Sequence, residues 1–293
     1  MSGRTAFVLA GGGSLGAVQV GMLKALTRKG IIPDLLVGSS VGAINAAFFA
    51  RLPTPEGLKG LERIWLGLQS TDVFPFSPLN SLLALLGKRD HLVSPARLEA
   101  LIKSELQYER IEDAKIPFHV VATDVLHGTE VCFDRGPLAP ALLASAAIPA
   151  VFPTVSIEDR YLIDGGVANN TPISSAVKLG ASRIIVLATG ISCALEKPPR
   201  GVVALAMHAL NLLVMRQLLS DIEHFSSHAE LIVLPPLCPV TVSSYDFSQT
   251  AELMRRSEAR TRQWLQQNGL QGRGAPREMF AHQHEHGAHG ATL

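Results

Sequence analysis

The sequence has few charged residues and few aromatic ones. Lysine, arginine, aspartate and glutamate make up 17% of its 293 residues, against about 25% in an ordinary soluble domain. The 26 basic and 25 acidic side chains leave a net charge of +1, so no basic excess indicates nucleic-acid binding. Hydrophobic residues nevertheless reach 47%, which excludes a disordered chain. Three features would each explain this aliphatic content: a deep core, contact with a membrane, or an apolar substrate.

Cysteine is scarce, and no segment has the features of a membrane span. Cys132, Cys193 and Cys238 are far apart and cannot all pair within the chain, which is typical of reduced thiols in the cytoplasm. The apolar stretch near the N-terminus has only six residues, too few for a signal peptide. The longest uncharged run, residues 136–157, contains four prolines that would interrupt a transmembrane helix. We therefore expect a cytoplasmic protein, at most in peripheral contact with a membrane.

Apolar, β-branched segments alternate with helical ones along most of the chain. Strands are predicted at 5–10, 34–39, 117–123, 130–133, 183–189 and 231–234, and helices at 16–29, 41–51, 55–68, 95–107, 138–146, 172–179, 201–228 and 248–268. Several strands are almost entirely apolar, as in a sheet covered on both faces. The alternation predicts an α/β sandwich with a mostly parallel central sheet, in one domain over residues 1–268.

The segment 269–293 differs in composition from the rest of the chain. It is rich in glycine and histidine and contains little apolar material. Its four histidines, His282, His284, His286 and His289, could in principle bind a metal ion. No framework fixes their geometry, so we expect a disordered tail and no metal site. Nothing in the sequence indicates an oligomeric state.

A glycine-rich turn follows the first predicted strand. Gly11, Gly13 and Gly16 match G-x-G-x-x-G, which is compatible with a dinucleotide site. Such a site needs an acidic residue at the end of the second strand, but Asp34 stands at its beginning, and no Walker lysine follows the turn. The same turn could form an oxyanion hole, since glycines let backbone N–H groups converge and the next helix adds its positive end. The glycines alone leave both interpretations open.

A second motif, G-x-S-x-G, ends the second predicted strand. It covers residues 38–42, and a predicted helix follows it. A strand–turn–helix of this kind holds the serine hydroxyl clear of the backbone, and Gly38 and Gly42 avoid clashes within the turn. The N-terminus of the helix would stabilise a developing oxyanion. Ser40, rather than its neighbour Ser39, is therefore the candidate nucleophile.

The base that such a serine needs is not evident among the histidines. None of those outside the tail stands in a loop of the kind that supplies a catalytic histidine. Asp164 is a better candidate, because a short apolar segment leads it into Gly165 and Gly166. Burial would have to raise its pKa for it to act near neutral pH. An ordinary turn aspartate would show the same pattern, so the spacing alone does not decide its role.

In combination, these motifs resemble the patatin-like phospholipase family. The resemblance spans about residues 5–190 and is carried, in the family's order, by residues 11–16, 38–42, 144–149, 152–153, 164–166 and 169–172. It implies a three-layer α/β/α sandwich and a Ser40–Asp164 dyad without histidine. It also implies hydrolysis of a lipid acyl ester, of the phospholipase A or lysophospholipase type, with no cofactor.

The resemblance places the oxyanion hole in the first glycine turn, at Gly11, Gly12, Gly13, Ser14 and Gly16. Many relatives carry arginine or lysine where Leu15 stands, so the hole would rest here on backbone N–H groups and helix dipoles. A transacylase on the same scaffold is an alternative, because only the acyl acceptor differs. A nucleotide-binding protein would use the same turn but leave the serine and aspartate motifs unexplained.

Residues 73–89 are a candidate for contact with a membrane. They carry no charge before Lys88 and Arg89, and an apolar segment with a basic edge suits an anionic bilayer. A buried helix that ends in a basic cap explains the same pattern and is the simpler interpretation.

Overall fold

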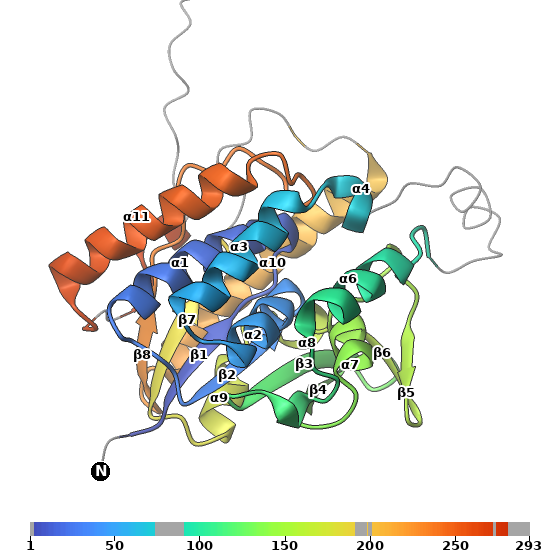
Figure 1. Ribbon diagram of the computed structural model, residues 1–293, viewed down its shortest axis with the longest axis horizontal. Coiled ribbons are helices and arrows are strands. Elements are labelled where there is room, and N and C mark those ends of the chain that lie inside the picture. Colours follow the sequence, from blue (N-terminus) through green and yellow to red (C-terminus); the bar gives the residue numbers. More distant parts are fainter. Residues whose placement is uncertain (1–2, 74–90, 191–197, 199–200, 272–273, 281–293) are drawn as a thin grey trace, which may run out of the picture.

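The computed structural model describes residues 3–73, 91–190, 198, 201–271 and 274–280. Within them an eight-stranded sheet lies between two layers of helices (Figure 1). The strands are β1 (Thr5–Leu9), β2 (Leu35–Ser39), β3 (Phe118–Asp124), β4 (Thr129–Phe133), β5 (Val155–Ile157), β6 (Arg160–Asp164), β7 (Arg183–Leu187) and β8 (Glu230–Val233).

The helices account for most of the remaining chain. The α-helices are α1 (Ala17–Arg28), α2 (Val41–Arg51), α3 (Pro55–Gly67), α4 (Ser70–Val73), α6 (Ala96–Leu106), α7 (Leu138–Ser145), α8 (Gly166–Asn169), α9 (Ile173–Lys178), α10 (Val202–Phe225) and α11 (Thr250–Asn268). Three short 3-10 helices are η1 (Gly13–Gly16), η2 (Ile111–Asp113) and η3 (Arg277–Met279). Every strand and helix predicted over the described residues is present, with ends that differ by a few residues.

The central sheet is mostly parallel, as predicted. The strand order is β5-β6-β3-β2-β1-β7-β8, with β4 also paired to β3. The pairs β1–β2, β1–β7, β2–β3 and β7–β8 are parallel. The strands β4 and β6 join β3 in antiparallel fashion, and β5 extends β6. Parallel pairing of β1 with β2 matters for function, because the turns that follow the two strands meet at one edge of the sheet.

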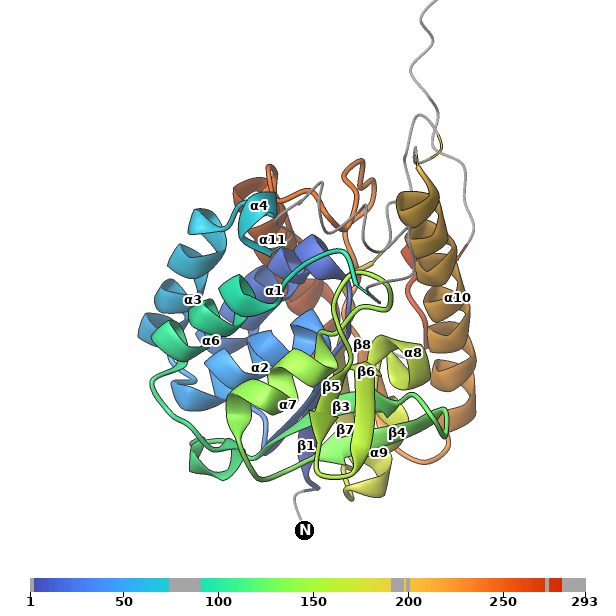
Figure 2. The ribbon, with the colours of Figure 1, turned by 90° about the vertical axis from the view of Figure 1, so that its right-hand side faces the viewer.

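Two hydrophobic cores explain the high aliphatic content. Side chains alternate along β1, so that Phe7 and Leu9 enter one core while Ala6 and Val8 enter the other. The first core lies beneath α1, α2, α3, α6, α7 and α11, and the second beneath α9 and α10. Figure 2 shows these two groups of helices on either side of the sheet. The three-layer α/β/α sandwich is therefore confirmed.

The uncharged run 136–157 forms part of this domain. It supplies α7, a turn and β5, and its prolines stand at or near the ends of these elements. None of the described helices is long and apolar enough to cross a membrane. The run also lines a cavity beside Ser40, through Ala146, Ile148 and Phe152. It is therefore part of the folded domain.

Ordered structure continues past the domain boundary expected at residue 268. The segment after α11 returns to the domain, where Met279 is buried in the second core. An ion pair between Arg260 and Glu278 holds this segment against α11. The four histidines of the predicted tail lie outside the described residues.

Candidate active site

Ser40 occupies a sharp turn between β2 and α2. Its backbone has φ 53° and ψ −129°, a conformation that costs a residue other than glycine about 1–3 kcal/mol. Gly42 makes the turn possible, because a Cβ at that position would collide with the carbonyl oxygen of Leu9 on β1. The side chain of Ser40 is thereby held at the edge of the sheet where β1 and β2 end. This geometry is that of a nucleophile elbow.

Asp164 reaches Ser40 because of the register of three neighbouring strands. Ser39 pairs with Val121 of β3, and the next residue of β3, Ala122, pairs with Asp164 of β6. The Ser40 hydroxyl donates a hydrogen bond of 2.7 Å to Asp164 Oδ2. The backbone N–H of Gly166 donates to Asp164 Oδ1, also at 2.7 Å. Both carboxylate oxygens are therefore held in place, one of them by the candidate nucleophile.

Burial gives Asp164 the character of a base near neutral pH. The loss of hydration raises the pKa of its carboxyl group to about 6, although the hydrogen bonds from Ser40 and Gly166 act to lower the pKa. A general base works best when its pKa lies close to the working pH. A carboxyl group with a pKa of about 6 is mostly ionised at neutral pH, which is the state a proton acceptor requires.

Ser145 connects the two catalytic candidates, although it was not predicted as a site residue. The backbone N–H of Ser40 donates to Ser145 Oγ at 2.9 Å, and the Ser145 hydroxyl donates to the Val121 carbonyl at 2.5 Å. The Ser145 carbonyl accepts from the Gly165 N–H at 3.1 Å. Ser145 is fully buried at the end of α7. Its signals in the sequence are its polarity within an otherwise apolar helix and its place in the block 144–149.

Two N–H groups of the glycine turn make no hydrogen bond within the described part of the chain. Within the predicted oxyanion hole, the Gly11 N–H donates to the Asn170 carbonyl at 3.0 Å and the Ser14 N–H to the Ser244 carbonyl at 2.8 Å. The N–H groups of Gly12 and Gly13 have no acceptor among the described residues. Gly13 has φ 58°, which glycine adopts without strain. Gly16 lies farther along, as the N-cap of α1.

A buried polar network supports the glycine turn from beneath. Gln19 Nε2 donates to the carbonyls of Ala10 and Leu187, at 2.7 and 3.0 Å, where β1 and β7 end. Asn45 Nδ2 donates to the Gly16 carbonyl at 3.0 Å and to Gln19 Oε1 at 2.9 Å. Trp65 Nε1 donates to Asn45 Oδ1 at 2.9 Å. Sequence reasoning missed this network because its members lie on three different helices and strand ends, without a shared motif.

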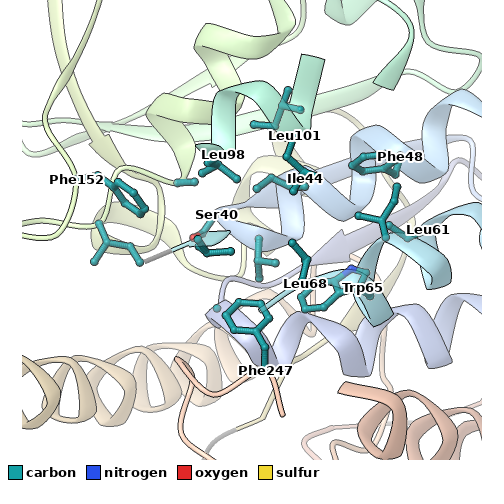
Figure 3. Close-up of a pocket in the computed structure, with 17 residues that line it drawn as sticks. Ser40, Ile44, Phe48, Leu61, Trp65, Leu68, Leu98, Leu101, Phe152 and Phe247 are labelled. Atoms are coloured by element: carbon teal, nitrogen blue, oxygen red, sulfur yellow. The ribbon is translucent and has the colours of Figure 1, made fainter. Parts of the chain in front are cut away.

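Ser40 lies where two cavities meet. The first has a volume of about 70 Å³, and its walls are almost entirely apolar. Figure 3 shows aliphatic and aromatic side chains from α2, α3, α6 and later segments around this pocket, with the Ser40 hydroxyl among them. We call it the apolar pocket; its labelled residues besides Ser40 are Ile44, Phe48, Leu61, Trp65, Leu68, Leu98, Leu101, Phe152 and Phe247.

The second cavity has a volume of about 50 Å³ and a more polar lining than the first. Gly13, Ser40 and Ile148 border both cavities, whereas Asp164 borders only the second. None of the described residues that line either cavity is a histidine. The described chain also has no cluster of three or more histidine, cysteine, aspartate or glutamate side chains that could hold a metal ion.

Asp34 lies far from the glycine turn, at the opposite end of the sheet. It directly precedes β2, and its Oδ2 accepts the backbone N–H of Thr5 at 2.7 Å, at the start of β1. The glycine turn follows the other end of β1. Asp34 therefore does not supply the acidic group that a dinucleotide site requires near the glycine turn.

Sequence comparison relates this chain to known proteins. The sequence model of a family described as patatin-like phospholipase matches residues 7–177. An uncharacterized NTE family protein of Mycobacterium tuberculosis is 32% identical over 190 residues, which cover 64% of this chain and 49% of that protein. Patatin-like phospholipase domain-containing protein 7 of Rattus norvegicus is 28% identical over 187 residues, covering 63% of this chain and 13% of the relative.

A solved structure shares the fold. The crystal structure of VipD from Legionella pneumophila superposes with a TM-score of 0.52 and 15% sequence identity, covering 91% of this chain and 67% of that one. Compared with its relatives in sequence, the chain spans about half the length of the mycobacterial protein and a small part of the mammalian one.

Proposed function

Because this chain belongs to the patatin-like phospholipase family, we propose that it hydrolyses acyl esters of lipids with Ser40 as nucleophile and Asp164 as general base. The observation that carries the proposal is the 2.7 Å hydrogen bond from the Ser40 hydroxyl to Asp164 Oδ2, made at a strained turn. The N–H groups of Gly12 and Gly13, for which the described residues provide no acceptor, support the same chemistry.

Formation of the acyl-enzyme is the first step. Asp164 accepts the hydroxyl proton as Ser40 Oγ attacks the ester carbonyl carbon. The N–H groups of Gly12 and Gly13 donate to the oxyanion of the tetrahedral intermediate, and the N-terminus of α2 adds its positive end. When the intermediate collapses, the bond to the alcohol breaks and the proton held by Asp164 passes to the departing oxygen.

Hydrolysis of the acyl-enzyme repeats these roles. Asp164 takes a proton from a water molecule, whose oxygen attacks the carbonyl carbon of the acylated Ser40. The Ser40–acyl bond then breaks, the proton returns to Ser40 Oγ, and the fatty acid is released. No step requires a metal ion or a cofactor, since each proton moves between Asp164 and an oxygen atom.

The apolar pocket is suited to hold the acyl chain. It begins at Ser40 and is walled by residues such as Ile44, Trp65 and Phe152. Burying one methylene group is worth about 0.8 kcal/mol, so each added methylene should raise kcat/KM about fourfold until the pocket is filled. Leu98→Trp, which narrows the pocket, should reduce the rate for long-chain esters more than for acetate esters.

Contact with a lipid surface is a further part of the proposal. The segment 73–89 lies outside the described residues except for Val73, which lines the apolar pocket. Co-sedimentation with anionic vesicles should weaken when Leu82 and Leu85 are both replaced by aspartate. Undiminished binding of a folded double variant would remove this part of the proposal.

The test of the proposed chemistry is hydrolysis of p-nitrophenyl esters by matched serine variants. Ser40→Ala and Asp164→Asn should each lower the rate by several orders of magnitude. Ser39→Ala is the control, because the neighbouring Ser39 hydroxyl is buried and has no hydrogen-bond partner within the described part of the chain. It should retain nearly full activity. Full activity of Ser40→Ala would show that the proposed mechanism is wrong.

A further inference from the structure

The apolar pocket follows helix α2 away from Ser40. Ser40 is the N-cap of α2, and Ile44 and Phe48 line the pocket from later turns of the same helix. Residues four positions apart lie on one face of a helix, so these two side chains stand one behind the other. Figure 3 shows Ile44 between Ser40 and Phe48. The turns of α2 therefore set how far each side chain lies from the nucleophile.

Two further helices, α3 and α6, run along the pocket and are tied to α2. Trp65 Nε1 of α3 donates to Asn45 Oδ1 of α2 at 2.9 Å. At the other end of α2, the Arg51 guanidinium donates to the Glu105 carbonyl at 3.1 Å and to Gln107 Oε1 at 2.7 Å. Moving either helix outwards would break these hydrogen bonds, so they hold the width of the pocket.

A third cavity, with a volume of about 360 Å³, lies beyond Phe48. We call it the polar cavity, because charged and amide side chains line much of it: Arg51, Glu56, Arg63, Glu105 and Gln107. Phe48, Leu61 and Ile64 border both this cavity and the apolar pocket. The apolar pocket thus ends at a partition of three side chains, and the surface behind the partition is unfavourable for an alkyl chain.

Phe48 is the member of this partition that shares a helix with Ser40. It stands eight residues after Ser40, which corresponds to about 12 Å along a helix axis. Long side chains of a helix lean towards its N-terminus, which leaves about 10 Å for the chain. A carbon chain with bonds of about 1.5 Å advances about 1.25 Å per atom. The space between Ser40 and Phe48 therefore accepts about eight carbon atoms.

The volume of the apolar pocket gives a similar length. A group the size of a water molecule needs about 10–15 Å³ of such a cavity, and a methylene group is of similar size. The pocket volume of about 70 Å³ then holds about five to seven methylene-sized groups beyond the carbonyl carbon. This corresponds to an acyl chain of about six to eight carbon atoms.

We propose that Phe48 closes the apolar pocket and limits the acyl chain of the ester to about eight carbon atoms. The inference rests on the proposed serine hydrolase function and defines its acyl specificity. Up to this length each methylene group is buried against apolar side chains. A longer chain has to displace the packed Phe48 ring and then meets charged groups, so it gains nothing from its additional carbons.

The wild-type protein is assayed with p-nitrophenyl esters from acetate to hexadecanoate, all presented in mixed micelles of one nonionic detergent. We expect kcat/KM to rise with chain length as far as about octanoate and to fall about tenfold by dodecanoate, since displacing a packed core side chain is costly. A rise that continues to dodecanoate would overturn the inference.

Removal of the Phe48 ring should lengthen the preferred chain. Phe48→Ala joins the apolar pocket to the space behind it, so the ratio of kcat/KM for dodecanoate to that for octanoate should rise about tenfold or more. Phe49→Ala is the matched control. It removes the same ring from the next residue, which is buried against Phe7 and lines neither cavity. An unchanged ratio in Phe48→Ala, or an equal shift in Phe49→Ala, would contradict the role of Phe48.

A larger side chain one turn nearer to Ser40 should have the opposite effect. Ile44→Phe fills the pocket about 5.4 Å closer to the nucleophile, so the optimum should shorten by about four carbon atoms, to butanoate. This variant adds volume where Phe48→Ala removes it, and it tests the inference even if Phe48→Ala fails to fold. An optimum at octanoate in folded Ile44→Phe would show that the acyl chain does not follow α2.

Hydrolysis of p-nitrophenyl acetate separates this inference from the function on which it rests, because an acetyl group is too short to reach Phe48. If the acetate is not hydrolysed, or if Ser40→Ala hydrolyses it at the wild-type rate, the proposed hydrolase function fails. If hydrolysis depends on Ser40 but the preferred chain length does not depend on Phe48, only the specificity inference fails. The acetate rate also shows which variants are folded, and the wild-type profile tests the inference without any variant.

Discussion

Replacement of Asp164 by asparagine should make the protein more stable at mildly alkaline pH while it abolishes activity. Burial raises the pKa of this carboxyl group from 3.8 to about 6, so the folded state disfavours its charged form. A shift of one pKa unit corresponds to 1.36 kcal/mol, and this shift therefore corresponds to about 3 kcal/mol. The wild-type protein carries this cost whenever Asp164 is ionised.

The pH dependence of this cost follows from the sign of the shift. Because the pKa in the folded state is raised, the stabilisation from protonated Asp164 is fully present below about pH 4 and is lost as pH rises through about 6. Asparagine has no charge to bury. Its Oδ1 can still accept from the Gly166 N–H and its amide can donate to Ser40 Oγ. The variant should be more stable than wild type by about 3 kcal/mol at pH 8, and by about half that at pH 5.

Urea unfolding at the two pH values, followed by circular dichroism, measures the difference. Asp134→Asn serves as the control, because Asp134 is exposed and its hydrogen bond with Arg135 lowers its pKa. That variant should gain no stability at either pH. The reasoning is refuted if Asp164→Asn is no more stable than wild type at pH 8, or if its gain is the same at both pH values.

The remaining predictions concern the groups around Ser40. For a short-chain ester, kcat/KM should fall as pH drops below about 6, since only ionised Asp164 accepts a proton; a flat pH–rate profile would contradict its role. Ser145→Ala leaves the Ser40 N–H buried without its acceptor, so it should cost about 1–3 kcal/mol in urea unfolding and lower kcat. Trp65→Phe keeps an aromatic ring in the apolar pocket but removes the hydrogen bond to Asn45. This variant should lower the free energy of unfolding by about 1–3 kcal/mol as well. An unchanged urea midpoint would show that the hydrogen bond from Trp65 to Asn45 adds no stability.

The fold could be predicted to a large extent because its signals are local. Apolar strands such as β1 and β2 are visible in a window of a few residues, and the glycine turn and serine elbow follow them directly. The strand β5 escaped prediction since it has only three residues, none of them buried, and is defined by its pairing with β6. The same holds for the short helix α8, which directly follows the Asp-Gly turn.

The details of the site depend on contacts between residues far apart in the chain. Ser14 was predicted as an oxyanion donor, yet its N–H is taken by the carbonyl of Ser244, which stands on the segment after β8. The role of Ser145 likewise requires Ser40 and Val121 to come together across the sheet. Neither contact leaves a pattern in sequence spacing. The second cavity, lined in part by α10, belongs to the same class of features.

Labelling with a fluorophosphonate, followed by peptide mass spectrometry, tests the central claim most directly. Such a reagent modifies a serine only when that serine is activated as a nucleophile. We expect one modified residue, Ser40, with labelling abolished in Ser40→Ala, strongly slowed in Asp164→Asn and retained in Ser39→Ala. Modification of another residue at the same rate in Ser40→Ala, or an unlabelled wild-type protein, would contradict the assignment of Ser40 as the nucleophile.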